Sequence, residues 1–150
     1  MLLTDAALAW LHFVLAFLMV GALVAELFIL RLPMDAKVVR LVTRVDLIYG
    51  VSAGLLVVAG ISRVIWGIKG WSYYHGQPFF WAKMATIALI GLISILPTIT
   101  FLRWKKAIGA NGGTIVPEAE VRRMRRYVMG ETHLIALVLA FAVLMARAIG

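Results

Sequence analysis

The chain has 150 residues, is 63% hydrophobic and 15% charged, and contains no cysteine. Soluble domains are roughly 45–50% apolar and about 25% charged, so this composition predicts an integral membrane protein. The lack of cysteine excludes disulfides, thiolate metal sites and iron–sulfur clusters. The net charge of +8 would suggest nucleic-acid binding in a soluble protein. Here most of that charge flanks apolar runs, which favours basic loops that face anionic lipid. No nucleic-acid partner is therefore expected.

Four apolar runs have about the length of a bilayer-crossing helix, roughly 20 residues. They cover about residues 6–30, 45–68, 79–104 and 127–148. The first run lacks a basic start and is too long for a signal peptide, so it is expected to remain as a span. Residues 110–117 are interpreted as a flexible linker, followed by a helix that continues into the fourth span. The expected fold is all-α: one transmembrane domain, a four-helix bundle with antiparallel up-down spans.

Basic residues gather in two of the three connections between spans. Eleven of the fifteen lie there: Arg31, Lys37, Arg40, Arg44, Arg103, Lys105, Lys106, Arg122, Arg123, Arg125 and Arg126. By the positive-inside rule these connections face the cytoplasm of a bacterial inner membrane. Both termini and the 66–77 connection are therefore expected outside. Trp10, Trp66, Trp71 and Trp81 are expected at the outer membrane boundary and Trp104 at the inner one.

Ionisable residues inside the apolar runs are costly, so each is a candidate for function. Helix rise sorts them by depth, since Glu26 lies about 21 Å further along its span than His12. The expected outer set is His12, Arg63 and Lys83, and the expected inner set is Glu26, Arg44, Asp46, Arg126, Glu131 and His133.

The inner set mixes acids with bases, which favours a structural network of ion pairs at the helix ends. A proton path or an anchor for a partner remains the alternative interpretation.

The outer set is cationic and has no intramembrane acid at its depth, so it could hold an anionic ligand. Neutral imidazole is the commonest protein ligand of haem iron, and haem also carries two propionates. In the simpler alternative His12 bonds a neighbouring backbone group and Lys83 extends to the headgroups. A metal site at His12, near Met19 and Met84, is a weaker possibility.

Four fragments carry a close resemblance to a known group of proteins. They are "DLIYG" (46–50), "RVIWGIKG" (63–70), "QPFFWAK" (77–83) and "LISILPT" (92–98). The chain resembles a bacterial family of predicted inner-membrane proteins of unknown function, which implies no activity.

A more distant similarity connects the chain to the HemJ-type protoporphyrinogen oxidases, four-helix membrane proteins that bind haem b. It rests on His12 in "WLHFVLAF", Lys83 in "FFWAK" and Glu131 in "RRYVMGE". The resemblance implies that His12 and Lys83 are the haem-associated, functional pair. The first span is also similar to that of CopD-type copper-resistance proteins. Arg63, Lys69, the aromatic 71–81 segment and the stretch around Ser94–Pro97 depart from the HemJ-type pattern, so the resemblance implies the scaffold and the haem site rather than the oxidase activity.

The leading hypothesis is therefore a haem b-binding redox protein. His12 would be the axial ligand, Arg63 would hold a propionate, and Lys83 would be a ligand or the catalytic residue beside the haem. Electrons from a tetrapyrrole substrate would pass to a quinone or respiratory partner. The alternative is a non-enzymatic membrane component, either a metal or solute permeation protein or a structural subunit. Small residues around Gly50 and Gly54 permit close helix contact, so a homo-oligomer is expected.

Overall fold

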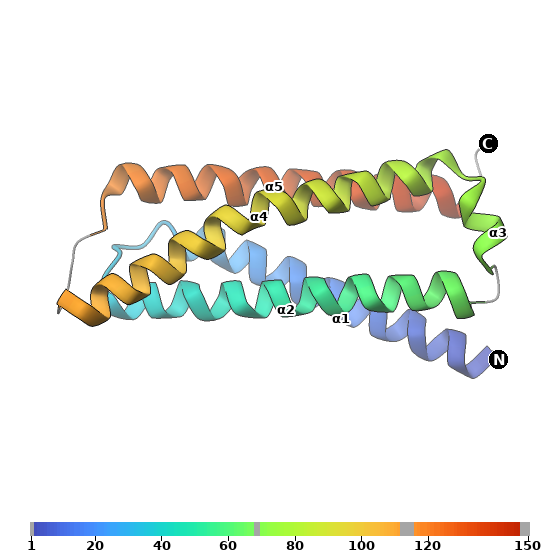
Figure 1. Ribbon diagram of the computed structural model, residues 1–150, viewed down its shortest axis with the longest axis horizontal. Helices are drawn as coiled ribbons and strands as arrows, with labels where there is room; N and C mark the ends of the chain where they lie inside the picture. Colours follow the sequence, from blue (N-terminus) through green and yellow to red (C-terminus); the bar gives the residue numbers. More distant parts are fainter. Residues whose placement is uncertain (1, 68–69, 112–115, 148–150) are drawn as a thin grey trace.

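Four long helices and one short helix make up the protein (Figure 1). The computed structural model describes residues 2–67, 70–111 and 116–147. The long helices are α1 (Leu2–Ile29), α2 (Ala36–Trp66), α4 (Pro78–Asn111) and α5 (Glu118–Ala146), and the short one is α3 (Gly70–His75). No strand occurs in the described part of the chain.

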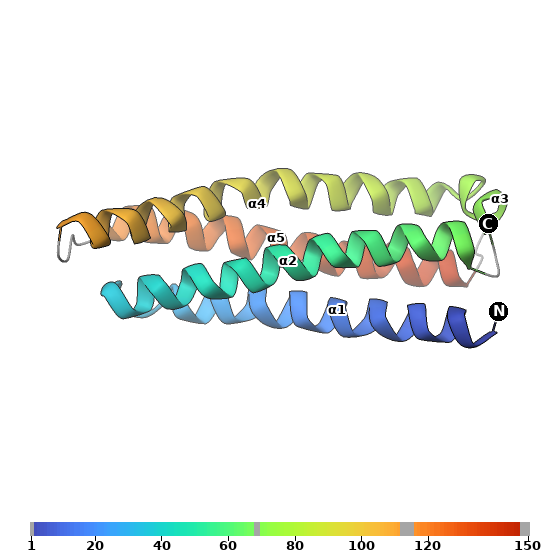
Figure 2. The same cartoon turned by 60° about the horizontal axis from the view of Figure 1, so that its bottom comes forward.

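The long helices run antiparallel to their sequence neighbours and form a four-cornered bundle (Figure 2). α1 packs most extensively on α2 and α4 on α5, and these two pairs meet through α2 with α4 and α1 with α5. Both termini and α3 lie at one end, called here the terminal end. The α1–α2 and α4–α5 connections lie at the other, called the basic end because it carries the eleven basic residues named above.

All four long helices are long and apolar enough to cross a membrane. Large apolar side chains cover their outward faces, as at Phe17, which is 80% exposed, and Leu92, 69% exposed. Such a surface is unfavourable in water but matches the lipid interior. The prediction of an all-α, multi-pass membrane bundle is therefore confirmed.

The helices extend beyond the predicted spans at the basic end. α2 begins at Ala36 because Asp35 caps it: Asp35 Oδ1 accepts hydrogen bonds from the backbone N–H of Lys37 and Val38, both 2.8 Å. α4 has 34 residues, about 51 Å of helix, whereas the hydrocarbon layer is about 30 Å thick. The first two residues of the predicted 110–117 linker belong to α4, and 112–115 lie outside the described residues. α5 continues through the fourth predicted span without a break.

The 66–77 connection, predicted as a loop, contains helix α3. It starts at Gly70, whose φ of +66° suits a residue without a side chain. Trp71 makes edge-on contacts with Phe80 and Trp81, and Trp81 Nε1 donates a hydrogen bond to the His75 carbonyl, 3.1 Å. These aromatic contacts tie α3 to the start of α4. The second predicted span ends at residue 68 and the fourth at residue 148, and Lys69 is one of the departures from the HemJ-type pattern. These three residues lie outside the described residues.

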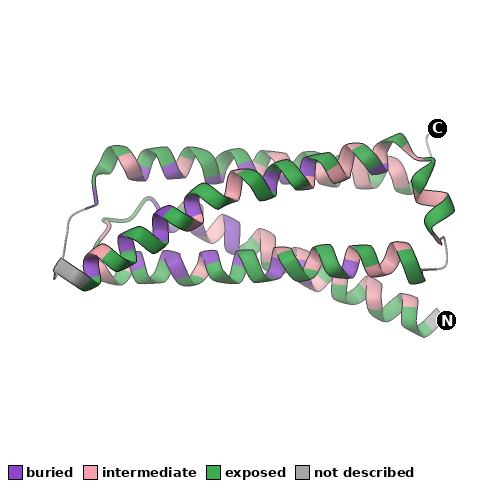
Figure 3. Cartoon of the chain, in the orientation of Figure 1, coloured by how far each residue is buried: buried purple, intermediate pink, exposed green. Residues whose placement is uncertain are grey.

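Buried residues are concentrated toward the basic end (Figure 3). Phe101 and Met124 are completely buried there, whereas the last buried residue of α5 is Ile135. Trp104 is also buried, against Phe101, so its ring packs inside the bundle. The reason is that α4 and α5 stay paired beyond the predicted span and enclose the ring. Pro97 lies inside α4, which continues through it and bows gently along its length (Figure 2).

Candidate functional site

Three carboxyl groups are buried together in the bundle. Glu26 of α1, Asp46 of α2 and Glu131 of α5 are 1%, 5% and 1% exposed. They are close enough for their charges to act on one another. Acidic side chains inside a membrane bundle are costly and commonly mark a functional site. These three residues are called the carboxyl cluster below.

Two hydroxyl groups donate hydrogen bonds to the carboxyl cluster. Tyr49 of α2 donates to Glu131 Oε2, 2.8 Å, and Thr98 of α4 donates to Asp46 Oδ1, 3.0 Å. α2 and α5 stand at opposite corners of the bundle, so the Tyr49–Glu131 bond crosses its interior. The second oxygen of Glu131 and Oε1 of Glu26 are buried without a hydrogen-bond partner among the described residues. The cluster thus has more acceptors than donors.

The expected network of ion pairs does not form around these acids. Within the described residues the two ion pairs are Arg103–Glu120 and Arg122–Glu118, and both link residues of the basic end. Arg44 and Arg126, assigned to the inner set from the sequence, are exposed. For a long basic side chain near a helix end, placing the charge in water or among headgroups costs less free energy than placing it in the bundle interior.

His133 does not join the carboxyl cluster either. Its side chain is exposed, and its Nδ1 lies 2.7 Å from the Met129 carbonyl of its own helix. The ion-pair interpretation of the inner set is therefore wrong, because the buried cluster is acidic.

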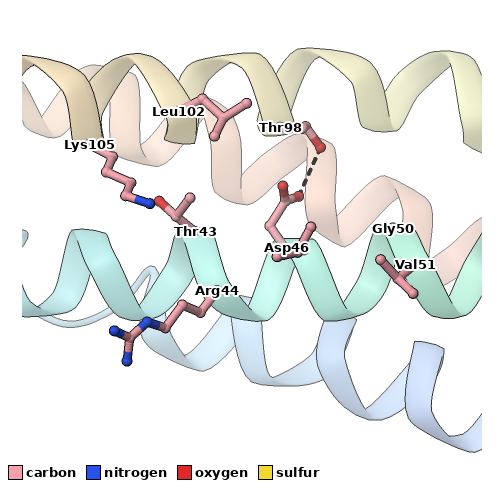
Figure 4. A pocket seen from close by; sticks show the side chains of 9 residues that line it. Thr43, Arg44, Asp46, Gly50, Val51, Thr98, Leu102 and Lys105 are labelled. Carbon is pink, nitrogen blue, oxygen red and sulfur yellow. Dashed lines mark hydrogen bonds between the residues drawn. The ribbon is translucent and has the colours of Figure 1, made fainter.

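A hollow of about 340 Å³ opens between α2 and α4 beside the cluster (Figure 4). Asp46 points across it toward Thr98, whereas Arg44 projects from the opposite side of α2. Lys105 reaches from α4 toward α2 on the side of the basic end. Asp46 is thus the carboxyl that faces this space.

A second group of ionisable residues lies nearer the terminal end. His12 of α1, Arg63 of α2 and Lys83 of α4 are half-buried, and the two cations act electrostatically on His12. His12 packs against Gly60 of α2: a Cβ atom added to Gly60 would lie 3.5 Å from His12 Cε1. His12 Nδ1 and Arg63 Nε are buried and have no hydrogen-bond partner among the described residues. His12, Arg63 and Lys83 are called the terminal cluster below.

The terminal cluster carries no acid of its own. Asp5 lies beside the end of α2, where its Oδ1 would be 3.3 Å from a Cβ atom added to Gly67, but the described residues show no ion pair between Asp5 and the cluster. No three His, Asp or Glu side chains in the described ranges could hold a metal ion together. A metal at His12 would therefore need ligands from elsewhere, whereas an anionic ligand would meet two cations.

Residues 4–150 match a family described as predicted membrane protein, DUF2214. The chain belongs to this family. The match confirms the close resemblance to a membrane family of unknown function. No curated protein and no solved structure matches the chain.

Sequence reasoning about this DUF2214 chain missed two members of the site. Tyr49 and Thr98 looked like ordinary polar residues of a span, and the structure makes them the donors to the buried acids. One signal was available for Tyr49: it follows Asp46 by three residues, which places both on one helix face.

Proposed function

We propose that the protein is a membrane redox protein that binds haem b at the terminal cluster. The observation that supports this most is the buried His12 Nδ1 that lacks a hydrogen-bond partner. Buried polar atoms are normally paired, and an imidazole nitrogen left free is suited to bind iron. Arg63 and Lys83 provide two positive charges, which match the two propionates of haem. The residues of the cluster therefore fit this group.

When bound, haem supplies one-electron redox chemistry, and the protein sets its position and surroundings. In this proposal Arg63 would hold a carboxylate through paired N–H donors, and Lys83 would bind a carboxylate of the haem or of a substrate. Lys83 is the proposed catalytic residue. The sparse burial near the terminal end is compatible with a bound group there. A reduced tetrapyrrole is the proposed substrate class, and a quinone or respiratory protein the proposed electron acceptor.

The interaction of His12 with Gly60 allows a test that leaves every chemical group of the cluster in place. Gly60→Leu puts a large side chain against the His12 ring, which an added Cβ already approaches to 3.5 Å. We expect this variant to lose most of its haem because the ring is displaced, measured as haem per purified chain. Gly21→Leu is the matched control, since a Cβ at Gly21 meets nothing within 4 Å. Equal haem loss in both variants would contradict the assignment of haem to the His12 side of the bundle.

The proposed location is the bacterial inner membrane, with the basic end in the cytoplasm and both termini outside. The eleven basic residues at one end support this orientation. A C-terminal alkaline phosphatase fusion should be active, because that enzyme folds only outside the cytoplasm. The same enzyme fused after Asn111 should be inactive. The opposite pattern would reverse the orientation.

A homo-oligomer is part of the proposal. Gly50 and Gly54 are exposed, lie four residues apart on α2 and have open space beside them. Small residues at this spacing let two membrane helices approach closely.

The second candidate is a non-enzymatic component that moves a solute or an ion across the membrane. The buried acids without counter-cations favour it, because such groups line ion and proton routes in membrane proteins. This candidate predicts colourless protein even when cells have ample haem.

A further inference from the structure

We infer that the carboxyl cluster is a proton-binding site that exchanges protons with the basic end through the hollow between α2 and α4. The inference does not depend on haem binding at the terminal cluster. It rests on the charge balance of the cluster, on the geometry of its oxygens and on the position of Asp46.

The charge balance requires protons. The polar groups that face the cluster come from all four long helices: Glu26, Asp46 with Tyr49, Thr98 and Glu131. They provide three carboxyls, two hydroxyl donors and no cation. A buried ionised carboxyl without a cation or donors is strongly unfavourable. Glu26 receives no hydrogen bond within the described residues, and its side chain is 1% exposed. The cluster is therefore satisfied only when it holds at least one proton, which Glu26 carries or shares.

The geometry favours a proton over a metal ion. A divalent cation needs several oxygens around one point, and no three acidic or imidazole groups among the described residues are so placed. A proton needs only one oxygen, and Oε1 of Glu26 and of Glu131 are both available. An ionised carboxyl only accepts hydrogen bonds, whereas a protonated carboxyl also donates one. A single proton can therefore provide the donor that these two acceptor oxygens lack.

Asp46 connects the cluster to the exterior. It interacts electrostatically with Glu26 and Glu131, and it also lines the hollow beside Thr98. Lys105, which is exposed, lines the hollow on the side of the basic end, so the hollow extends toward that end. At the other end the cations of the terminal cluster oppose the passage of positive charge. The arrangement therefore favours access from the basic end alone.

The proton content can be tested with dicyclohexylcarbodiimide on the purified full-length protein in liposomes. A protonated carboxyl in an apolar site adds across one C=N bond of this reagent, and the adduct rearranges to a stable acylurea that mass spectrometry locates. Glu26 should be labelled at least about tenfold more than the exposed Glu118. A tenfold ratio corresponds to a preference for the neutral form that is roughly 1.4 kcal/mol larger at Glu26 than at Glu118. Equal labelling of Glu26 and Glu118 would overturn the inference. Protection of Glu26 by sodium at constant pH would also overturn it, in favour of an alkali-cation site.

The route can be tested by hydrogen–deuterium exchange of the carboxyl C=O infrared band after transfer to D₂O. Asp46→Asn should slow this exchange severalfold, whereas Asp35→Asn should leave it unchanged, since asparagine also caps helices. Leu102→Trp, which fills the hollow between Thr98 and Lys105 and so lies on the route toward the basic end, should slow exchange while keeping every carboxyl. This second variant keeps the test valid if Asp46→Asn does not fold. Wild-type exchange rates in Leu102→Trp would overturn the proposed route.

Discussion

Replacing His12 with alanine is expected to lower bound haem from about one per chain to almost none, because His12 is the imidazole that would hold the iron. The other two histidines are poor substitutes. His75 is exposed in α3, and His133 is exposed on α5 and bonded to its own backbone. The measurement is haem per chain in protein purified from cells with ample haem.

His133→Ala is the matched control for this variant. It removes an imidazole from the same bundle without touching the terminal cluster, so its haem content should equal that of the wild type. Equal haem in the wild type and in His12→Ala would remove His12 as the ligand, and with it the HemJ-type interpretation.

The largest loss of stability is expected from Phe101→Ala. Phe101 is fully buried and packs against Trp104 with ring centroids 5.4 Å apart. Phe→Ala in a core costs about 3–5 kcal/mol, from lost burial and from the cavity that remains. We expect about 3 kcal/mol here, since lipid is itself apolar and part of the burial term disappears. The free energy of unfolding can be measured by denaturant titration in mixed micelles.

Ile99→Ala controls for lost side-chain volume on the same helix. Ile99 is 58% exposed, so its side chain faces lipid and its removal opens no cavity. It should change the unfolding free energy by less than about 1 kcal/mol. Equal effects of the two substitutions would show that the core at the basic end is not packed as described.

The four spans could be predicted because hydropathy over about 20 residues is a strong signal in a membrane protein. The ends of the helices could not, because they depend on caps and on pairing beyond the lipid. Asp35 marks the start of α2, yet the residues after it are too basic to be read as part of a span. α3 escaped notice because six residues carry too little periodicity, and because it is held by contacts with residues outside the helix, such as that of Trp71 with Phe80.

Helix rise predicts how far along the bundle each ionisable residue lies. It does not predict which side chain that residue contacts. Whether Arg44 turns inward toward Asp46 or outward to solvent depends on side-chain direction, which spacing along the chain leaves open. The bond from Tyr49 to Glu131 joins residues 82 positions apart on opposite corners of the bundle. Only the packing of all four helices brings them together.

The absorption spectrum of the purified full-length protein tests the proposed function most directly. The protein should be expressed with ample haem, extracted in mild detergent and measured before and after addition of dithionite. We predict a Soret band that shifts on reduction and a haem content near one per chain. A colourless protein that is folded and shows neither band nor shift would contradict haem binding and favour the non-enzymatic candidate.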